Sequence, residues 1–406
     1  MGHVQDRWWK PAKDEAGKPV LDSRGRPKRE KTTLFGKGMR YKVRYLDLDG
    51  NEHSVSYPDG QKKEAESFLA SVEADKQRGS FVNPNSGKVP FRSVAKSWLD
   101  SRTFDRSTHE AVETRLRNHV FPHFGDNPIK DIRPSRIQAW DRGLQKQGLA
   151  DTYRRVIFTH VSSVFSFAID DELITKNPCS ARSVTKPPAS STKVEPWPEE
   201  TVFKIRESIT ARYRIAVDLG SGCGLRQGEV FGLSPDDIGE DRYITVRRQV
   251  KLIEGKPVFA PPKGGKIRRV PVANQIEKNI AKHINEFGAP EVTLPWKDPD
   301  EGEPMTVKLL VTNRNEGAVI RYPFNTDIWK PAVRRAGVEK PTRRDGFHAL
   351  RHFFASILLD QGENIRALSD YLGHFDPGFT LKVYTHLMPS SLERTQRAVD
   401  TVFGRH

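Results

Sequence analysis

Apolar positions recur with two different periods along the chain, and the first is the period of a β-strand. Residues 41–45 alternate large apolar side chains with Lys42 and Arg44, which predicts a strand with one buried face and one polar face. The Asp49-Gly50 pair favours a hairpin turn, and residues 53–57 continue as a second strand. This region therefore predicts a small sheet whose basic face could enter a DNA groove.

A helix and a basic arm flank this hairpin. Ala65, Leu69 and Val72 recur at helical spacing in a segment that reaches Arg78. Residues 10–31 are rich in Lys, Arg, Pro and Gly and contain few large aliphatic side chains. That composition is typical of a mobile basic arm, and equally of a plain solvated tail.

Helical spacing takes over after the turn residues Asn83–Gly87. Four helices are predicted, and the last one ends before Asn177-Pro178. Their apolar positions are Val94, Trp98 and Leu99; Val112, Leu116 and Val120; Ile137, Trp140 and Leu144; and Val156 through Ile169. Arginines are spread over this bundle and could follow a phosphate backbone, although each one is also an ordinary surface charge. They are Arg115, Arg117, Arg133, Arg136, Arg154 and Arg155.

A proline-rich linker, residues 186–198, separates the bundle from a third segment. This third segment opens with a helix and continues into short strands. Strands are predicted at residues 243–246, 258–259 and 269–272, with the turn Lys263–Lys266 before the last of them. Several helices follow, and we find no internal repeat in the chain.

Length and charge limit the class of protein. At 406 residues the chain is long enough for two or three domains of about 150 residues each. Its 67 Lys and Arg exceed its 52 Asp and Glu by 15, which favours a polyanionic partner such as nucleic acid, an acidic membrane face or an acidic protein. Because no apolar run suits a signal peptide or a membrane helix, we expect a soluble cytoplasmic protein.

The two cysteines, Cys179 and Cys223, exclude some classes of site. Two cysteines give neither a disulfide framework nor a paired-cysteine zinc site. We expect both to be small buried residues.

Arg226 lies in a glycine-rich stretch, Gly222–Glu229, inside an apolar helical region. A dinucleotide-binding loop would need its third glycine where Gln227 stands, and no Gly-Lys pair continues into Ser or Thr as a phosphate-binding loop requires. We therefore expect no ATP site. The glycines let the backbone bend closely past a substrate, and Glu229 is spaced to hold the guanidinium of Arg226 by an ion pair.

His348 and Arg351 emerge on one side of a predicted helix, because they lie three residues apart. A zinc-binding helix would need a glutamate directly after His348, with His352 as the second ligand, and Ala349 stands there instead. We interpret His352 as a mainly structural residue.

A helix end and a turn lead to Tyr384. Gly373 suits a helix end because it tolerates positive φ, and His374 follows directly, either pointing out of the core or capping the helix. A tight turn at Asp376–Gly378 precedes the helix that presents Tyr384. One phenol thus follows five groups that can bind or protonate a phosphate, a series that indicates metal-free phosphoryl transfer through a covalent tyrosine. The five are Arg226, Lys263, His348, Arg351 and His374.

Four short motifs resemble the signature of the tyrosine recombinases, the phage-integrase type of site-specific recombinase. The motifs are Gly224–Glu229, His348–His352, Leu372–His374 and Tyr384–His386. Lys263, in a turn ahead of Arg268, occupies the position where that family keeps its catalytic lysine. The motifs span roughly residues 215 to 390, and the two preceding segments look like the core-binding and arm-binding domains of the larger integrases.

The resemblance implies a multidomain, mainly α-helical fold with small β-sheets. Residues 1–82 would hold the basic arm and an arm-binding domain made of a three-stranded sheet and a helix. Residues 88–185 would form a SAM-like helical core-binding domain. Residues 195–406 would form a mixed α+β catalytic domain with a C-terminal tail.

The resemblance also implies the chemistry of the site. Tyr384 would attack the scissile phosphate to form a 3′-phosphotyrosine and release a 5′-hydroxyl. Arg226 and Arg351 would grip the non-bridging oxygens, and His374 would donate a further hydrogen bond. Because the phosphotyrosine keeps the energy of the broken bond, no ATP, metal or other cofactor is needed.

The remaining roles complete the implied site. Lys263 would protonate the leaving 5′-oxygen, and His348 would take the proton of the tyrosine or tune the pocket. Glu229 would support Arg226. The residues expected to contact DNA are Lys42, Arg44, Arg115, Arg154, Arg155 and Arg268.

The partners that the resemblance implies are double-stranded DNA, at core-type and arm-type attachment sites, and three further copies of the chain in a tetramer on DNA. A directionality factor or a DNA-bending protein would be an accessory partner, and no membrane is involved. An apolar stripe in the tail would dock on a neighbouring subunit or on its own domain; its members are Leu392, Val399, Val402 and Phe403. The function expected is integration or excision of a phage or mobile element. The alternatives are a type IB topoisomerase and a DNA-binding regulator that has lost catalysis.

Overall fold

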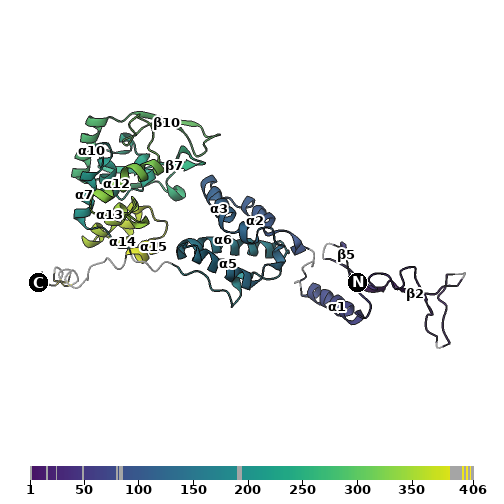
Figure 1. Ribbon diagram of the computed structural model, residues 1–406. Coiled ribbons are helices and arrows are strands. Elements are labelled where there is room, and N and C mark those ends of the chain that lie inside the picture. Colours follow the sequence, from purple (N-terminus) through teal and green to yellow (C-terminus); the bar gives the residue numbers. More distant parts are fainter. Residues whose placement is uncertain are drawn as a thin grey trace. The chain divides into compact units, whose positions relative to one another are not determined.

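The computed structural model describes residues 2–14, 17–23, 25–47, 50–78, 81, 86–189, 194–384, 396, 399–400 and 403, and Figure 1 shows its elements. The chain separates into two compact units, Met1–Thr103 with Ala111–Ser190 and Phe104–Glu110 with Ser191–His406. Among the described residues no helix is both long and apolar enough to cross a lipid bilayer. Some of the predictions concern residues outside the described part, namely Asp49, Asn83, Pro84, Asn85, Thr385, His386, Leu392 and Val402.

The N-terminal sheet has three antiparallel strands in the order β1-β4-β5. They are β1 (His3–Asp6), β4 (Tyr41–Leu46) and β5 (Glu52–Tyr57), and the helix α1 (Lys62–Gln77) follows them. Tyr41, Val43 and Tyr45 are buried with Ala65 and Val72 of α1, so the predicted hairpin and helix are confirmed. The four residues of β1 were too few for the periodic pattern to reveal them.

The opposite face of this sheet is polar. Strand pairing sets Lys42 between Gln5 and Ser56, and Arg44 between His3 and Ser54. These side chains alternate with the buried ones, because neighbouring residues of a strand point to opposite faces. Arg44 donates a hydrogen bond to Glu52 over 2.8 Å. The predicted basic face therefore exists, and Glu52 pairs with one of its two cations.

The segment between β1 and β4 is more regular than the predicted mobile arm. The short strands β2 (Trp9–Pro11) and β3 (Arg29–Lys31) pair with each other, and the described residues between them make hydrogen-bonded turns. Backbone hydrogen bonds join Ala12 to Lys28, Val20 to Ala12, and Lys28 to Val20. The glycines and prolines of this segment thus mark turns, and its mobility stays a prediction.

A short internal repeat explains these turns. Ala12–Val20 and Val20–Lys28 share Asp, Gly, a basic residue and Pro at the same offsets. In the first copy the Asp14 carboxylate accepts the Lys18 N–H at 2.8 Å, and in the second the Asp22 carboxylate accepts the Arg26 N–H at 2.9 Å. The prediction that the chain has no internal repeat is therefore corrected.

The central domain is a helical bundle around one apolar core. Its helices are α2 (Phe91–Asp100), α3 (Arg106–His119), α4 (Phe121–Phe124), α5 (Pro134–Lys146) and α6 (Asp151–Asp170). Most of the predicted apolar positions are buried, but Val156 is 41% exposed, and Phe167 and Ile169 are only partly buried. The four predicted helices correspond to α2, α3, α5 and α6. Cys179 is buried in this core, as predicted.

The segment that follows the proline-rich linker mixes helices with three two-stranded antiparallel ladders, β6 with β9, β7 with β8, and β10 with β11. The strands are β6 (Tyr243–Val246), β7 (Gln249–Ile253), β8 (Lys256–Ala260), β9 (Arg268–Pro271), β10 (Glu291–Pro295) and β11 (Pro304–Lys308). The helices are α7 (Glu199–Ser208), α8 (Arg214–Gly222), α9 (Gln227–Phe231), α10 (Asn274–Phe287), α11 (Arg321–Pro323), α12 (Lys330–Arg335), α13 (His348–Asp360), α14 (Ile365–Leu372) and α15 (Pro377–Tyr384). Strands β7, β10 and β11 were not predicted, although their alternating residues carried the signal.

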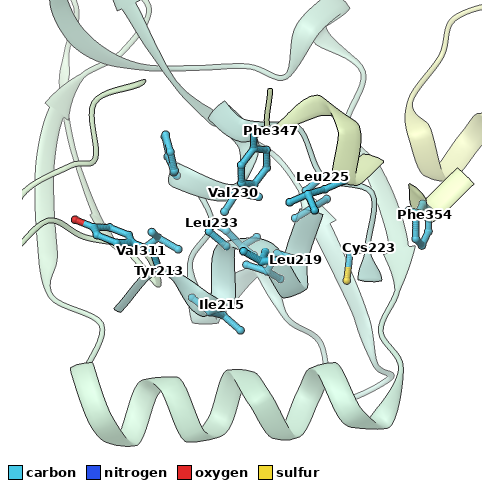
Figure 2. Packing of buried hydrophobic residues seen from close by; sticks show 14 of the residues in the cluster. Tyr213, Ile215, Leu219, Cys223, Leu225, Val230, Leu233, Val311, Phe347 and Phe354 are labelled. Carbon is cyan, nitrogen blue, oxygen red and sulfur yellow. The ribbon is translucent and has the colours of Figure 1, made fainter. Parts of the chain in front are cut away.

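The core of this domain surrounds α8 and α9. Figure 2 shows members of the buried cluster, among them Leu219, Leu225 and Val230. Cys223 belongs to the same cluster and is fully buried, as predicted. The packing of α13 against α8 fixes the backbone that carries His348 and Arg351. In the tail, Val399 and Phe403 are exposed.

Candidate active site

Gly224 makes the sharp turn between α8 and α9 that exposes Arg226. Its φ of +62° lies in the left-handed region, and a Cβ there would lie 2.4 Å from a ring carbon of Phe354. Only glycine fits that close approach. The turn leaves Arg226 as the residue just before α9, with part of its side chain exposed.

Glu229 is a buried carboxylate that holds two arginines. It accepts the Arg226 backbone N–H at 2.8 Å and the Arg226 Nη1 at 2.9 Å, the pair that the three-residue spacing predicts. Arg268 donates to both carboxylate oxygens, at 2.9 and 2.6 Å. Burial alone would raise the pKa of Glu229, but the hydrogen bonds and charge of Arg268, with Arg226, outweigh it and hold the pKa at about 2.

The position of Arg268 corrects one prediction. Its side chain is 3% exposed, and its Nε donates to the Tyr371 carbonyl at 2.7 Å while the other nitrogens bind Glu229. A guanidinium that is fully engaged inside the protein cannot contact DNA. Arg268 is therefore a support for Glu229, and not the DNA contact that its basic neighbourhood predicted.

Arg351 is fixed by two carbonyl groups. It is 1% exposed, and it donates to the Gly224 carbonyl at 2.7 Å and to the Leu372 carbonyl. Burial and then the charges of Arg226 and Arg268 lower its pKa to about 9. The group remains a cation at neutral pH, and the two carbonyls set the direction of its guanidinium plane.

His348 and His352 lie one turn apart on α13. Their ring centroids are 4.7 Å apart with an interplanar angle of 85°. His348 keeps an exposed edge, whereas His352 is more enclosed. Partial desolvation, followed by the charges of His352 and Arg351, lowers the pKa of His348.

Gly373 and His374 form the predicted helix end. Gly373 caps α14 in the left-handed conformation with φ +60°, and the Nδ1 atom of His374 lies 2.7 Å from the Thr380 hydroxyl. Phe379 packs against the imidazole with its ring edge-on. Burial and the charges of Arg351 and Arg226 lower the pKa of His374 to about 4.

Tyr384 ends α15 inside the same group of residues. It is 1% exposed, and its phenol oxygen lies 2.7 Å from the Nδ1 atom of His352. Burial raises the pKa of Tyr384 to about 12, while the charges of Arg351 and Arg226 act in the opposite direction. The phenol therefore lies in the electrostatic field of both guanidinium groups. The pattern of the sequence gave no sign that His352 would be its partner.

Lys263 is the one member of the predicted six that the structure leaves apart. It is exposed in a 3₁₀ turn, Lys263–Gly265, in which Gly264 has a φ of +78°. Its side chain makes no hydrogen bond or ion pair within the described residues. The structure thus brings together Arg226, His348, Arg351, His374 and Tyr384 and keeps the lysine on the loop between β8 and β9.

Two of the central arginines predicted to contact DNA differ sharply in exposure. Arg154 is 3% exposed and binds both oxygens of buried Asp141, at 2.6 and 2.7 Å, so that prediction is corrected. Arg155 is exposed and donates to the Pro187 carbonyl at 2.6 Å. Arg115 is half-buried, with its guanidinium 6.0 Å from the Tyr153 ring.

Arg155 borders a polar cavity of about 240 Å³ in the central domain. Two further cations, Arg102 and Lys186, line the cavity with it. The rest of the polar wall comes from α6 and consists of one carboxylate, Asp170, and four hydroxyl groups, Thr159, Ser162, Ser163 and Ser166. The recurrence of Ser and Thr along one helix was the sequence signal for this surface, and it was overlooked because apolar spacing was the criterion for helices.

Two family models match the chain. The phage integrase family matches residues 199–390, which hold Arg226, Lys263, His348, Arg351, His374 and Tyr384. The phage integrase central domain matches residues 91–183. The fold and the shared motifs agree with both matches, and the chain belongs to the phage integrase family of tyrosine recombinases. It is a tyrosine-type site-specific DNA recombinase.

Relatives of similar length come from phages and bacteria. A tyrosine recombinase XerC-like protein of Caldanaerobacter subterraneus is 27% identical over 68% of this chain and 72% of its own length. The integrase of Mycobacterium phage D29 is 25% identical over 82% of this chain and 87% of its own length. The ICEBs1 integrase of Bacillus subtilis is 24% identical over 78% of this chain and 84% of its own length.

Solved structures support the fold. The integrase of transposon Tn1549, in complex with transposon right-end DNA, is similar with a TM-score of 0.63 and 19% identity over 77% of this chain and 99% of that chain. A lambda integrase tetramer bound to a Holliday junction gives a TM-score of 0.53 and 17% identity over 86% of this chain and 92% of that chain. The multidomain fold of the tyrosine recombinases, mainly helical with small sheets, is therefore the fold of this protein.

Proposed function

We propose that Tyr384 is the nucleophile and that it breaks one DNA strand by attack on the scissile phosphorus. The observation that carries this proposal is the grouping of the phenol with Arg226, Arg351, His348 and His374. Fixed cations stabilise the charge that develops on a phosphorane-like transition state without a metal ion. Attack forms the tyrosine–phosphorus bond and breaks the bond to the 5′-oxygen.

The other groups take complementary roles. Arg226 and Arg351 bind the non-bridging oxygens, and His374 donates a further hydrogen bond to them. Lys263 protonates the leaving 5′-oxygen, which requires the β8–β9 loop to bring its side chain to the substrate. Glu229 keeps Arg226 oriented.

A covalent trap tests this proposal. The protein is incubated with a nicked duplex that carries its own attachment site, so that the 5′-hydroxyl fragment is lost and the adduct accumulates on a denaturing gel. The wild-type protein should give the adduct and Tyr384→Phe should give none. An adduct with Tyr384→Phe, or none with wild type, would contradict the proposal.

Product topology separates recombination from the alternatives. A type IB topoisomerase would relax a supercoiled plasmid that lacks an attachment site, and a regulator without catalysis would bind its site without forming an adduct. We propose integration or excision of a phage or mobile element, because the relatives named above are integrases of phages and of mobile elements. The place of action would then be the bacterial nucleoid.

We further propose that four copies assemble on DNA, by analogy with the lambda integrase tetramer. Lys42 and Arg44 on the polar face of the N-terminal sheet, together with the basic turns of residues 12–28, would bind arm-type sites. The separate apolar core of the N-terminal domain allows the test. Deletion of residues 1–82 should weaken binding to distal arm DNA and leave cleavage of a core site intact; unchanged arm binding would refute the assignment.

The cavity bordered by Arg155 is the proposed phosphate contact of the central domain at core sites. Three cations and four hydroxyls suit the oxygens of a DNA backbone, and the cations outnumber the one carboxylate of the lining, Asp170. A directionality factor or a DNA-bending protein would act with the tetramer.

A further inference from the structure

The phenol of Tyr384 contacts His352, the histidine interpreted from the sequence as mainly structural. Its oxygen lies 2.7 Å from the Nδ1 atom of His352, and the two rings are 5.7 Å apart. Tyr384 is 1% exposed, so water does not compete for this hydrogen bond. Among the described residues this is the only hydrogen bond of the phenol oxygen.

Helical geometry explains why His352 and not His348 meets the tyrosine. The two histidines are four residues apart and therefore lie on the same face of α13. His348 begins the helix and is partly exposed, and the charges of Arg226 and His374 act on it. His352, one turn further on, lies under α15, the helix that ends with Tyr384.

The environment of His352 determines its protonation. The groups that face it are His348 and Arg351 on its own helix, Tyr384 on α15 and His374 after α14, and Arg226 adds its charge at the phenol. Burial and the charge of Arg351 lower the pKa of His352 to about 4. At neutral pH the ring is therefore neutral. A neutral ring that accepts the phenol proton at Nδ1 carries its own proton on Nε2.

We infer that His352 receives the proton of Tyr384 when the tyrosine attacks DNA, and that it holds the phenol in place until then. This inference rests on the proposed function of Tyr384. The phenol proton moves to Nδ1 of His352, an electron pair of the phenol oxygen forms the bond to phosphorus, and the 5′-oxygen leaves with a proton from Lys263. In the reverse step His352 returns the proton to the tyrosine.

The charge of the substrate makes this transfer feasible. A phosphodiester bound near Arg351 and Arg226 brings a negative charge that offsets their effect on His352, so the imidazole becomes a stronger base when DNA is present. The phenol becomes more acidic as its oxygen bonds to phosphorus. His348, closer to the open side, then has the role of tuning the pocket.

The test is the rate of adduct formation in a single turnover on the nicked duplex, followed against pH. His352→Gln keeps a polar side chain of similar length but cannot take up a proton. We expect it to be about 100-fold slower than wild type near neutral pH. Its rate should rise about tenfold per pH unit, because hydroxide must then ionise a phenol whose pKa is about 12.

Controls separate this role from a structural one. The rates of wild type and of His348→Gln should both be independent of pH from about pH 6 to about pH 9, even if His348→Gln reacts at a different absolute rate. In a duplex with sulfur at the 5′-bridging position, the leaving thiolate needs no proton from an acid. This substrate should therefore restore the cleavage rate of Lys263→Ala, whereas His352→Gln should remain slow. Equal DNA affinity and an equal melting temperature for His352→Gln and wild type would verify folding.

The results that overturn the inference are distinct from those that overturn the function. If Tyr384→Phe gives no adduct while His352→Gln reacts as fast as wild type with the same profile, His352 takes no proton. If His352→Gln reacts faster than wild type, the hydrogen bond only holds the tyrosine in an unreactive position. If the sulfur substrate restores the rate of His352→Gln, His352 protonates the leaving 5′-oxygen instead. An adduct with Tyr384→Phe would refute the proposed function itself.

Discussion

Two regions of the molecule bury an arginine against a carboxylate, and only one of them belongs to the candidate active site. In the central domain Arg154 binds Asp141, and both side chains are almost completely buried. In the catalytic domain Arg268 binds Glu229, with 3% and 0% of their side chains exposed. Burial and ion pairing are alike in the two pairs, so neither property shows which pair belongs to the candidate active site.

The difference lies in the balance of charge. Arg154 is matched by Asp141 and also by Asp151 at the surface, at 2.6 and 2.7 Å. Glu229 is instead shared by Arg268 and Arg226, and buried Arg351 has only carbonyl partners. Three cations thus surround one carboxylate. Such an excess of buried positive charge is unfavourable without an anion, and the phosphate of DNA would supply it.

The largest effect is expected from loss of the shared carboxylate. Glu229→Gln leaves Arg268 buried without its anion and releases Arg226. We expect a loss of about 3–5 kcal/mol in the free energy of unfolding and a fall of at least about 100-fold in adduct formation. Denaturant unfolding and the single-turnover trap measure the two. A variant with normal activity would show that Arg226 needs no such support.

The matched substitution in the central domain should affect stability alone. Asp141→Asn removes the buried partner of Arg154 and leaves only the exposed Asp151, so we expect the bundle to lose about 3–5 kcal/mol of unfolding free energy. The fraction that remains folded at low temperature should cleave a core site at the wild-type rate. A cleavage defect in that folded fraction would mean that the Arg154 pair also serves the reaction.

A smaller effect should appear on acidification. The pKa values of His348, His352 and His374 are lowered in the folded protein, the last two to about 4, against a usual value near 6.5. Below about pH 6.5 the unfolded chain therefore binds more protons than the folded protein. The free energy of unfolding decreases as the pH falls from about 6.5 to about 4. Melting temperatures should fall over this range, and less so in His352→Gln. An equal fall in the variant would contradict the assignment.

The comparison also explains what the sequence could reveal. Local signals were sufficient for the backbone around Arg226 and His374: Gly224 and Gly373 mark turns with positive φ, and the spacing of Arg226 and Glu229 predicts their ion pair. Charge alone was insufficient. Arg154 and Arg268 have the same sequence character as exposed arginines, and only tertiary packing pairs them with Asp141 and Glu229.

Two other features could not be deduced from patterns. The contact between His352 and Tyr384 depends on how α15 packs on α13, thirty-two residues away in the chain. Apolar periodicity contains no information about that packing. The turns of residues 12–28 were missed for the opposite reason, because their signal is a repeat of Asp, Gly and Pro rather than a hydrophobic period.

The most direct measurement is to digest the trapped protein–DNA adduct with a protease and to identify by mass spectrometry the residue that carries the nucleotide. We expect one modified peptide, with a 3′-phosphodiester on the phenol oxygen of Tyr384. A nucleotide attached to any other tyrosine, or to a serine, histidine or lysine, would contradict the assignment of this site.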